Sequence, residues 1–360
     1  MDITKEEYGK LGEKTINKYI LKNNKGMEVN IIEYGARITK ISVPDKDNKF
    51  ENVVFGFDTL EEYIADQSFQ GAICGRVAGR IRNAEFYLNN EKYQLTKNDG
   101  INHLHGGEKN FSNVVWTGKI GRTYDTVFVE LKYHSKDGEE GYPGNFDISV
   151  KYTLDNNDTL TIDYRGKTDK PTIANLTNHA YFNLSGDFTE DIHKHSLEVD
   201  SLKYCELDDQ SIPTGRFVEM DRIGDHPFNF NIEEDIEKCF EYTPVEIASL
   251  FYFHFENGMD HPFLLTGDRA IKLSHYESGR NLSIETDKDA VVIYTSGNSP
   301  EPQRFKTICL EVQNLPDAIN YEYFGDITIT PEKEYKSTSR YTFGIIKPMG
   351  RLIFSPFIGF

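Results

Sequence analysis

Two segments of the sequence carry side chains that could move protons. Residues 308–313 read Ile-Cys-Leu-Glu-Val-Gln. Side chains alternate between the faces of a strand, so Glu311 shares a face with Cys309 and Gln313 while its neighbours are apolar. A carboxylate shielded from bulk water has a raised pKa, in the range useful for a general base. The plainer alternative is the exposed polar face of an antiparallel sheet.

The second segment ends in a histidine. Asn175, Thr177 and His179 alternate with apolar Leu176. Polar side chains in apolar surroundings need partners, either protein groups or a hydroxylated ligand. A satisfied histidine at a strand end explains the pattern equally well.

Three further segments supply basic, imidazole and carboxylate groups. Residues 70–81 contain Arg80 but lack GxGxxG spacing, so a dinucleotide loop is excluded, and a β-bulge with a surface arginine pair is the simple interpretation. In residues 100–107, His103 and His105 would share a strand face, but two histidines without a nearby carboxylate or thiol do not make a metal site. Asp260, near a proline, is typical of a turn.

Short alternating segments must position these groups. The pattern predicts two short helices, at residues 59–63 and 232–240. Strands are expected at residues 28–32, 38–43, 86–88, 93–95, 126–134, 146–154, 159–164, 271–275, 282–286 and 291–296. Many short strands without repeats or linkers predict an all-β fold, one large β-sandwich.

Composition narrows the function. The 360 residues carry a net charge of −18, which disfavours nucleic acid and anionic membranes as partners. No apolar run approaches the roughly 18 residues of a membrane span, and the N-terminus lacks the apolar region of a signal peptide. The four scattered cysteines predict reduced thiols. We therefore expect a cytoplasmic protein.

Taken together, the segments resemble the aldose 1-epimerase (galactose mutarotase) family. The resemblance runs in order from Tyr34-Gly35-Ala36 to Tyr341-Thr342-Phe343. Its most specific pieces are GRVAGRI at 75–81, NHLHGG at 102–107, TNHAYFNL at 177–184 and LEVQNLPDA at 310–318. It implies a mostly antiparallel galactose mutarotase-like β-sandwich, one domain over residues 1–343, and a C-terminal extension, 344–360, outside the family pattern.

The resemblance also implies roles for residues. Glu311 matches the catalytic base and His179 the catalytic acid, and the sugar ligands are Arg80, His105 and Asp260. Neither a metal nor an organic cofactor is implied. Some relatives carry asparagine where this chain has Gly79, so one hydroxyl contact is either missing or supplied by water.

The implied reaction needs one base and one acid near the anomeric carbon. Anomers of a free hexose interconvert when a base takes the C1 hydroxyl proton while an acid protonates the ring oxygen; the open chain then rotates about C1–C2 and recloses. Ordinary glutamate and histidine pKa values near 4.3 and 6.5 permit these roles near neutrality. A nearby negative charge would raise the pKa of His179 and favour its acid form.

Three alternatives stay open at this stage. A hexose-phosphate epimerase of the same fold would need further arginines or lysines for phosphate. A non-catalytic sugar-binding module would have no need of an acid–base pair. A metal-dependent lyase or isomerase would need more ligands than His193 and His195 offer. Both a monomer and a homodimer are compatible with the sequence.

Overall fold

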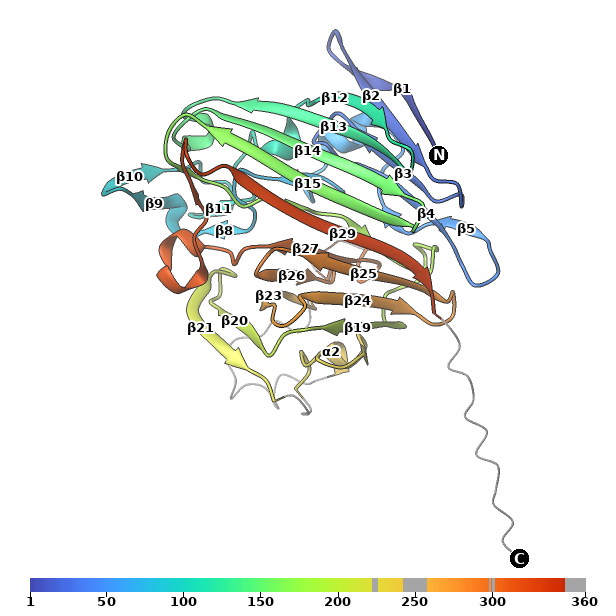
Figure 1. Cartoon of the computed structure of the whole chain (residues 1–360). Coiled ribbons are helices and arrows are strands. Elements are labelled where there is room, and N and C mark those ends of the chain that lie inside the picture. Colours follow the sequence, from blue (N-terminus) through green and yellow to red (C-terminus); the bar gives the residue numbers. More distant parts are fainter. Residues whose placement is uncertain (222–225, 242–257, 298, 300–301, 347–360) are drawn as a thin grey trace, which may run out of the picture.

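Antiparallel strands dominate the computed structural model of the chain (Figure 1). It describes residues 1–221, 226–241, 258–297, 299 and 302–346. Within these residues the α-helices are two short ones, α1 (Leu60–Ala65) and α2 (Lys238–Glu241). The expected all-β, mostly antiparallel fold is confirmed.

Two large sheets and a smaller one form the body of the described chain. The first sheet has nine strands, in the order β12 (Thr117–Arg122), β13 (Thr126–Ser135), β14 (Phe146–Asp155), β15 (Thr159–Thr168), β29 (Tyr335–Ile345), β25 (Arg280–Thr286), β24 (Ala270–His275), β19 (His195–Val199) and β22 (Glu234–Asp235). The second has seven, in the order β21 (Pro213–Glu219), β20 (Lys203–Leu207), β23 (Asp260–Leu264), β26 (Ala290–Tyr294), β27 (Ile308–Gln313), β18 (Tyr181–Phe182) and β6 (Val54–Phe55). The N-terminal sheet runs β1 (Asp2–Leu11), β2 (Lys14–Lys22), β3 (Glu28–Ile32), β4 (Ile38–Pro44) and β5 (Phe50–Asn52).

Short strand pairs and turns complete the described part. The pairs are β9 (Glu85–Leu88) with β10 (Glu91–Gln94), β8 (Arg80–Ile81) with β11 (His103–Leu104), β7 (Ile73–Cys74) with β17 (Thr177–Asn178), and β16 (Thr172–Ile173) with β28 (Thr328–Ile329). The 3-10 helices are η1 (Arg82–Ala84), η2 (Phe111–Asn113), η3 (Glu139–Gly141), η5 (Ala318–Asn320) and η6 (Glu322–Phe324).

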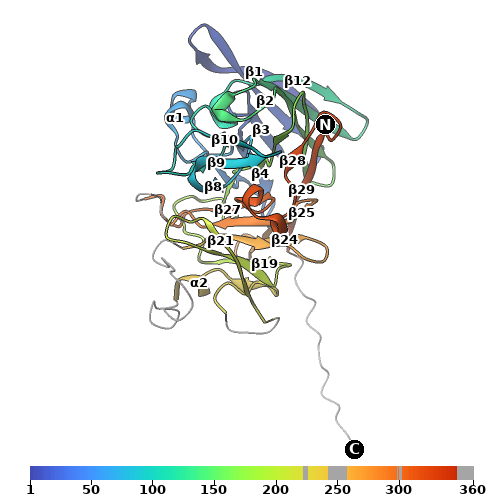
Figure 2. The same cartoon turned by 90° about the vertical axis from the view of Figure 1, so that its left-hand side faces the viewer.

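The sheets meet in one hydrophobic core. Inward-facing residues of β14, such as Val150, belong to the same buried cluster as Ile293 of β26 and Leu310 of β27. Such burial contributes about 1.5–3 kcal/mol for each large apolar side chain. In both views β1 and β2 lie at one end of the molecule, with β19 and α2 toward the other (Figures 1 and 2). The layered arrangement is the β-sandwich that the alternation predicts.

One predicted helix is confirmed and the other is mostly wrong. Thr59 caps α1 through a capping box with Glu62. Residues 232–240 contain β22, whose Glu234 pairs with Leu197 of β19, and α2 begins only at Lys238. Sheet pairing outweighs helix propensity there, because propensity is a weak preference of under 1 kcal/mol per residue.

The two ends of the described chain lie in sheets. The polar N-terminus forms the hairpin β1–β2, which the alternation pattern missed. β29 continues past Phe343 to Ile345, and Ile346 N donates to Gly279 O at 2.7 Å. Residues 347–360 of the expected extension lie outside the described part.

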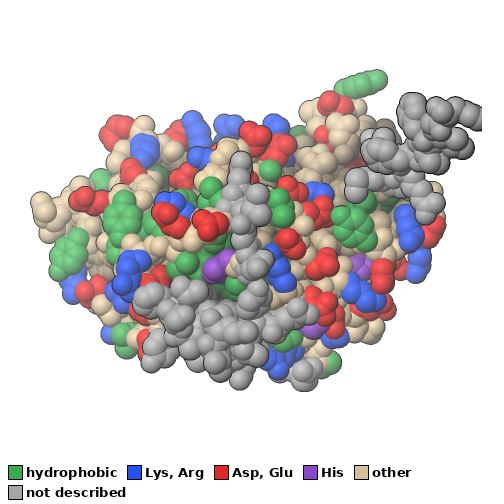
Figure 3. Space-filling view, turned by 90° about the horizontal axis from the view of Figure 1, so that it is seen from below, with side chains coloured by type: hydrophobic (Ala, Val, Ile, Leu, Met, Phe, Trp, Pro, Cys, Tyr) green, Lys and Arg blue, Asp and Glu red, His purple; other side chains and the backbone are tan. Residues whose placement is uncertain are grey.

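The cysteines, the helices and the surface charges bear on the expectations from composition. All four cysteines are buried and free. No helix in the described ranges has the length and apolar character to cross a membrane. Acidic and basic side chains are interspersed over the described surface seen from below (Figure 3).

Candidate active site

One face of three neighbouring strands forms the floor of a cavity in the described chain. Its volume is about 680 Å³, within the usual size range of small-molecule sites. Glu311 of β27 lies opposite Val292 of β26, which lies opposite Pro262 of β23, and all three line the cavity. In the next row Asp260 and Tyr294 lie opposite each other and also line it. The turn expected at Asp260 is therefore wrong, because this residue begins β23.

Glu311 sits mid-strand on the cavity face, as the alternation predicts. Ile308, Leu310 and Val312 point into the core, whereas Glu311 and Gln313 line the cavity. β27 lies between β26 and β18, so its backbone is paired on both sides. Glu311 is only 2% exposed, which excludes the exposed polar face as an explanation.

The polar residues that precede His179 position it next to Glu311. Thr177 Oγ1 donates to Val312 O at 3.1 Å. Asn175 Nδ2 donates to Asn314 O at 3.0 Å, and Asn175 Oδ1 accepts from Asn314 N at 2.9 Å. These bonds anchor the segment along β27. Two of the three polar residues therefore position the third, and His179 is left facing the cavity.

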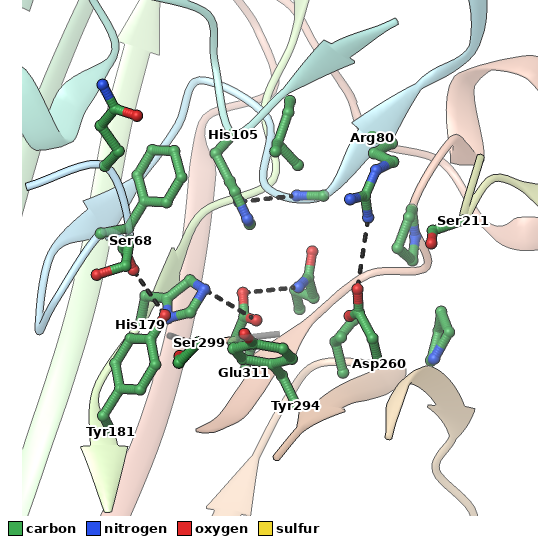
Figure 4. Close-up of a pocket in the computed structure, with 18 of the residues that line it drawn as sticks. Ser68, Arg80, His105, His179, Tyr181, Ser211, Asp260, Tyr294, Ser299 and Glu311 are labelled. Carbon is green, nitrogen blue, oxygen red and sulfur yellow. Dashed lines mark hydrogen bonds and ion pairs between the residues drawn. The ribbon is translucent and has the colours of Figure 1, made fainter. Parts of the chain in front are cut away.

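The two side chains meet, although 131 residues lie between them in the sequence. His179 Nε2 lies 3.3 Å from Glu311 Oε1, and Figure 4 shows the side chains pointing toward one another. The imidazole lies between aromatic rings: Tyr181 stacks at 4.9 Å between ring centroids, and Phe69 at 6.0 Å. These rings restrict the imidazole and keep water from its faces.

Burial dominates the electrostatics of the pair. It raises the pKa of Glu311 well above its ordinary value, reinforced by the negative charge of Asp260 and opposed by Arg80. It lowers the pKa of His179 to about 4, and the raising effect of Asp66 is smaller. A nearby negative charge, that of Asp66, does raise the pKa of His179 as expected, but desolvation of the imidazolium outweighs this effect and the acid form is disfavoured. Both side chains thus favour their neutral forms at these buried positions.

Arg80 and Asp260 face each other on the other side of the pocket (Figure 4). Arg80 Nη1 lies 3.7 Å from Asp260 Oδ2, and Arg80 Nε donates to Asp99 Oδ2 at 2.7 Å. Both side chains of the Arg80–Asp260 pair are partly exposed. Their outward-facing nitrogens and oxygens can donate to and accept from sugar hydroxyls.

His105 is held by Gly79 in a defined tautomer. Gly79 N donates to His105 Nδ1 at 3.2 Å, and His105 N donates back to Gly79 O at 3.0 Å. Because Nδ1 accepts, the proton of the neutral ring is on Nε2. Gly106 follows at φ 93°, where a Cβ would collide with the carbonyl oxygen of Gly75. His105 therefore offers one N–H donor on a tightly held loop.

A metal does not fit this arrangement, although its ligand types are suggestive. One ligand atom each from His105, His179 and Glu311 lie within 4.8 Å of one another. Coordination through His105 Nε2 would remove its proton and leave an imidazolate, since Nδ1 already accepts from a backbone amide. Coordination through Nδ1 would break that bond. The three side chains suit proton transfer and hydroxyl binding better than a cation.

The structure brings all five predicted site residues to one cavity and separates two others from it. Arg80, His105, His179, Asp260 and Glu311 all line it. Among the other candidates, Arg76 is buried and donates to Ser135 and Pro143, so the expected surface arginine pair is wrong. His103 bonds Thr96 O and Tyr142 Oη. It does not share a face with His105, because His105 has φ 49° and leaves the strand geometry.

Sequence reasoning missed two parts of the cavity. Phe69 packs against both imidazoles, at 4.7 Å from the His105 ring, and adopts φ 59°, a rare conformation for a bulky residue. No sequence pattern indicates that Phe69 contacts these imidazoles. Val292 and Tyr294 alternate with core residues on β26, so the sequence pattern could have shown that they share a face. The pattern could not have shown that this face lies next to Glu311.

Comparisons with known proteins identify the family of the chain. A family model described as Aldose 1-epimerase matches residues 17–342. Galactose mutarotase of Bos taurus is 34% identical over 360 residues, covering 96% of this chain and 99% of that protein. Galactose mutarotase of Homo sapiens is 34% identical over 359 residues, covering 95% and 99%. The crystal structure of galactose 1-epimerase from Lactobacillus acidophilus NCFM matches with a TM-score of 0.84 at 28% identity, covering 96% of this chain and 99% of that one.

The chain belongs to the aldose 1-epimerase family. It is an isomerase that interconverts the anomers of a free sugar, a small-molecule substrate.

Proposed function

We propose that the protein interconverts the α and β anomers of free hexoses, galactose and glucose among them, with Glu311 as base and His179 as acid. The observation that carries this proposal is the 3.3 Å approach of His179 Nε2 to Glu311 Oε1 at the floor of an open, sugar-sized cavity. A proton donor and a proton acceptor so close can serve adjacent oxygens of one pyranose ring.

The reaction begins with the ring closed. Glu311 takes the proton of the C1 hydroxyl while protonated His179 gives its proton to the ring oxygen, and the C1–ring oxygen bond breaks. The aldehyde turns about C1–C2 and presents its other face. The ring oxygen then attacks C1 and loses its proton to His179, while Glu311 returns a proton to the new hydroxyl. All proton transfers balance, and the protein ends as it began.

Burial helps the intermediate in this scheme. The reactive pair is ionised Glu311 with protonated His179, and ring opening leaves both neutral. Because burial raises the pKa of Glu311 and lowers that of His179, the cavity favours the neutral pair. The balance between the closed ring with the ionised pair and the open chain with the neutral pair is therefore shifted toward the open chain, compared with the same groups in water. Positioned acid and base groups each contribute about 10²–10⁴-fold to the rate.

Arg80, Asp260 and His105 hold the sugar in the proposed mechanism. Arg80 donates to hydroxyls, and Asp260 accepts from them, with charge-assisted hydrogen bonds. His105 donates through Nε2, since Gly79 N–H occupies Nδ1. Phe69 lies beside both imidazoles and supplies an apolar surface for C–H groups of the ring.

The charges of the cavity favour a free sugar over a sugar phosphate. Arg80 is the one arginine or lysine among the described residues that line the cavity. It already forms ion pairs with Asp99 and Asp260. A phosphate would meet two carboxylates there. We expect glucose 6-phosphate to be turned over at least tenfold more slowly than glucose, as kcat/KM measured by anomer exchange would show.

The test of function is polarimetry on freshly dissolved α-galactose and α-glucose. The wild-type protein should accelerate the approach to equilibrium, and Glu311→Gln and His179→Asn should each lose at least 100-fold in kcat while keeping the wild-type circular dichroism. His103→Asn, which lies outside the cavity, is the matched histidine control. Full activity in either cavity variant would refute the assigned roles.

A further inference from the structure

Gln313 is a buried polar side chain of the cavity whose amide is only half used. It lies two residues beyond Glu311 on the same face of β27 and is 0% exposed. Its Nε2 faces Glu311 Oε2 at 3.4 Å, whereas Oε1 has no hydrogen-bond partner among the residues that the structure describes. In the ionised form of Glu311 that the proposed reaction uses, the amide nitrogen belongs on the Glu311 side, because an ionised carboxylate only accepts. A buried amide oxygen without a donor is unfavourable, so this atom is suited to receive one from a ligand.

Gly79 lies next to this free oxygen and against Pro316. A Cβ at Gly79 would lie 3.5 Å from Gln313 Oε1 and 2.9 Å from the Cβ of Pro316. Gly79 has φ 73°, a conformation that asparagine tolerates. An asparagine here would place a second amide next to Oε1, and its Cβ would crowd Pro316. With glycine, residue 79 adds no side-chain donor beside Gln313 Oε1, which stays unpaired within the described part of the chain.

The two oxygens of Glu311 are held by different neighbours. His179 faces Oε1, and Gln313 faces Oε2. In a pyranose, C1 is bonded to the ring oxygen on one side and to C2 on the other. With the C1 hydroxyl at Glu311 and the ring oxygen at His179, the C2 hydroxyl falls on the Oε2 side, where Gln313 lies.

We propose that Gln313 Oε1 accepts a hydrogen bond from the C2 hydroxyl of the bound sugar, which makes Gln313 a specificity-determining residue. This inference rests on the proposed roles of Glu311 and His179. It extends the site beyond the five predicted residues. It also gives the protein a reason to prefer 2-hydroxy sugars over 2-deoxy sugars that does not depend on Arg80 or Asp260.

The experiment compares wild type with Gln313→Met, which keeps the length of the side chain and removes the amide. Anomer exchange by NMR gives kcat/KM for galactose, 2-deoxygalactose and 6-deoxygalactose. Wild type should prefer galactose over 2-deoxygalactose by about tenfold or more, the value of one hydrogen bond to a buried partner. Gln313→Met should reduce this preference to about threefold or less. The intrinsic reactivities of the sugars cancel when the two proteins are compared.

The 6-deoxy sugar is the matched control, because the ratio of kcat/KM for galactose to that for 6-deoxygalactose should be the same in wild type and Gln313→Met. If Gln313→Met slows all three sugars by one factor, Gln313 only positions Glu311 and the inference is overturned. If wild type does not accelerate galactose at all, the proposed function fails instead. Should the variant not fold, calorimetry on wild type decides: tighter binding of galactose than of 2-deoxygalactose by about tenfold supports the contact, and equal binding overturns it.

Discussion

At the scale of residues, the proposed mechanism treats Glu311 and His179 as one unit that holds a single proton, in keeping with their 3.3 Å separation. The proton sits on His179 in the charged pair and on Glu311 in the neutral pair, so the two forms have the same proton count. The measured pKa values will belong to the pair and not to either residue alone. Adding a second proton means protonating His179 beside neutral Glu311, and removing the only proton means ionising Glu311 beside neutral His179.

The pH profile of kcat/KM follows from these two steps. Because burial lowers the pKa of His179 to about 4, the acidic limb should fall near pH 4 and not near the ordinary histidine value. The raised pKa of Glu311 sets the alkaline limb, so activity is present below that pKa and is lost as pH rises through it. Polarimetry from about pH 3 to 10, corrected for the spontaneous reaction, measures both limbs. An acidic limb centred near pH 6.5 would contradict the assigned effect of burial.

At the scale of elements, the turn after α1 brings Phe69 over the imidazoles. Asp66 accepts from Ser68 N and Gln70 N, both at 2.8 Å, and from Arg37 Nη1 at 2.7 Å. The side chains of Arg37 and Asp66 are 0% and 2% exposed. Tyr181, which stacks on His179, donates to Ser68 O at 2.7 Å. One buried ion pair thus stabilises the turn on which the left-handed conformation of Phe69 depends.

Asp66→Asn should therefore lower both stability and activity. It leaves the Arg37 guanidinium buried without a counter-charge, which costs about 3–5 kcal/mol. Urea unfolding measures the loss, and kcat/KM under native conditions should fall as the turn loosens around Phe69. The control is Glu277→Gln, which removes an exposed partner of Lys194 and should change stability little. Equal stabilities of the two variants would show that the Arg37–Asp66 pair does not hold the turn.

At the scale of the whole molecule, the C-terminal strand closes the centre of the large sheet. β29 lies between β15 and β25, and its last pairs are Gly344 with Asn281 and Ile345 with Arg280. The single domain expected over residues 1–343 would end inside this strand. A proposed boundary after Ile346 keeps every described pair of β29.

Truncation tests that boundary. A chain ending at Phe343 loses the Gly344 and Ile345 pairs and the bond from Ile346 N to Gly279 O. Each backbone hydrogen bond contributes about 0.5–1.5 kcal/mol, so this chain should melt a few degrees below a chain ending at Ile346. Thermal unfolding followed by circular dichroism compares the two. Identical melting temperatures would mean that residues 344–346 add nothing to the fold.

Local periodicity explains what could be predicted from the sequence. Alternation in residues 308–313 indicated that Ile308, Leu310 and Val312 are core and that Glu311 faces away, and the pleat of a strand makes this a property of neighbouring residues alone. The same reasoning failed for His103 and His105, where a positive φ ends the alternation after Leu104. It failed for residues 232–240 because pairing with β19 decided their conformation.

By itself, the sequence determined the fold class, the polar face around Glu311 and, through resemblance, five candidate site residues. Only the tertiary structure decided that His179 meets Glu311, that Asp260 begins a strand beside them, and that Phe69 and Gln313 join the site. The physical reason is the distance along the sequence over which each effect acts. Side-chain alternation is set within a few residues of one strand, whereas the approach of β17, β23 and β27 depends on contacts between segments far apart in the chain.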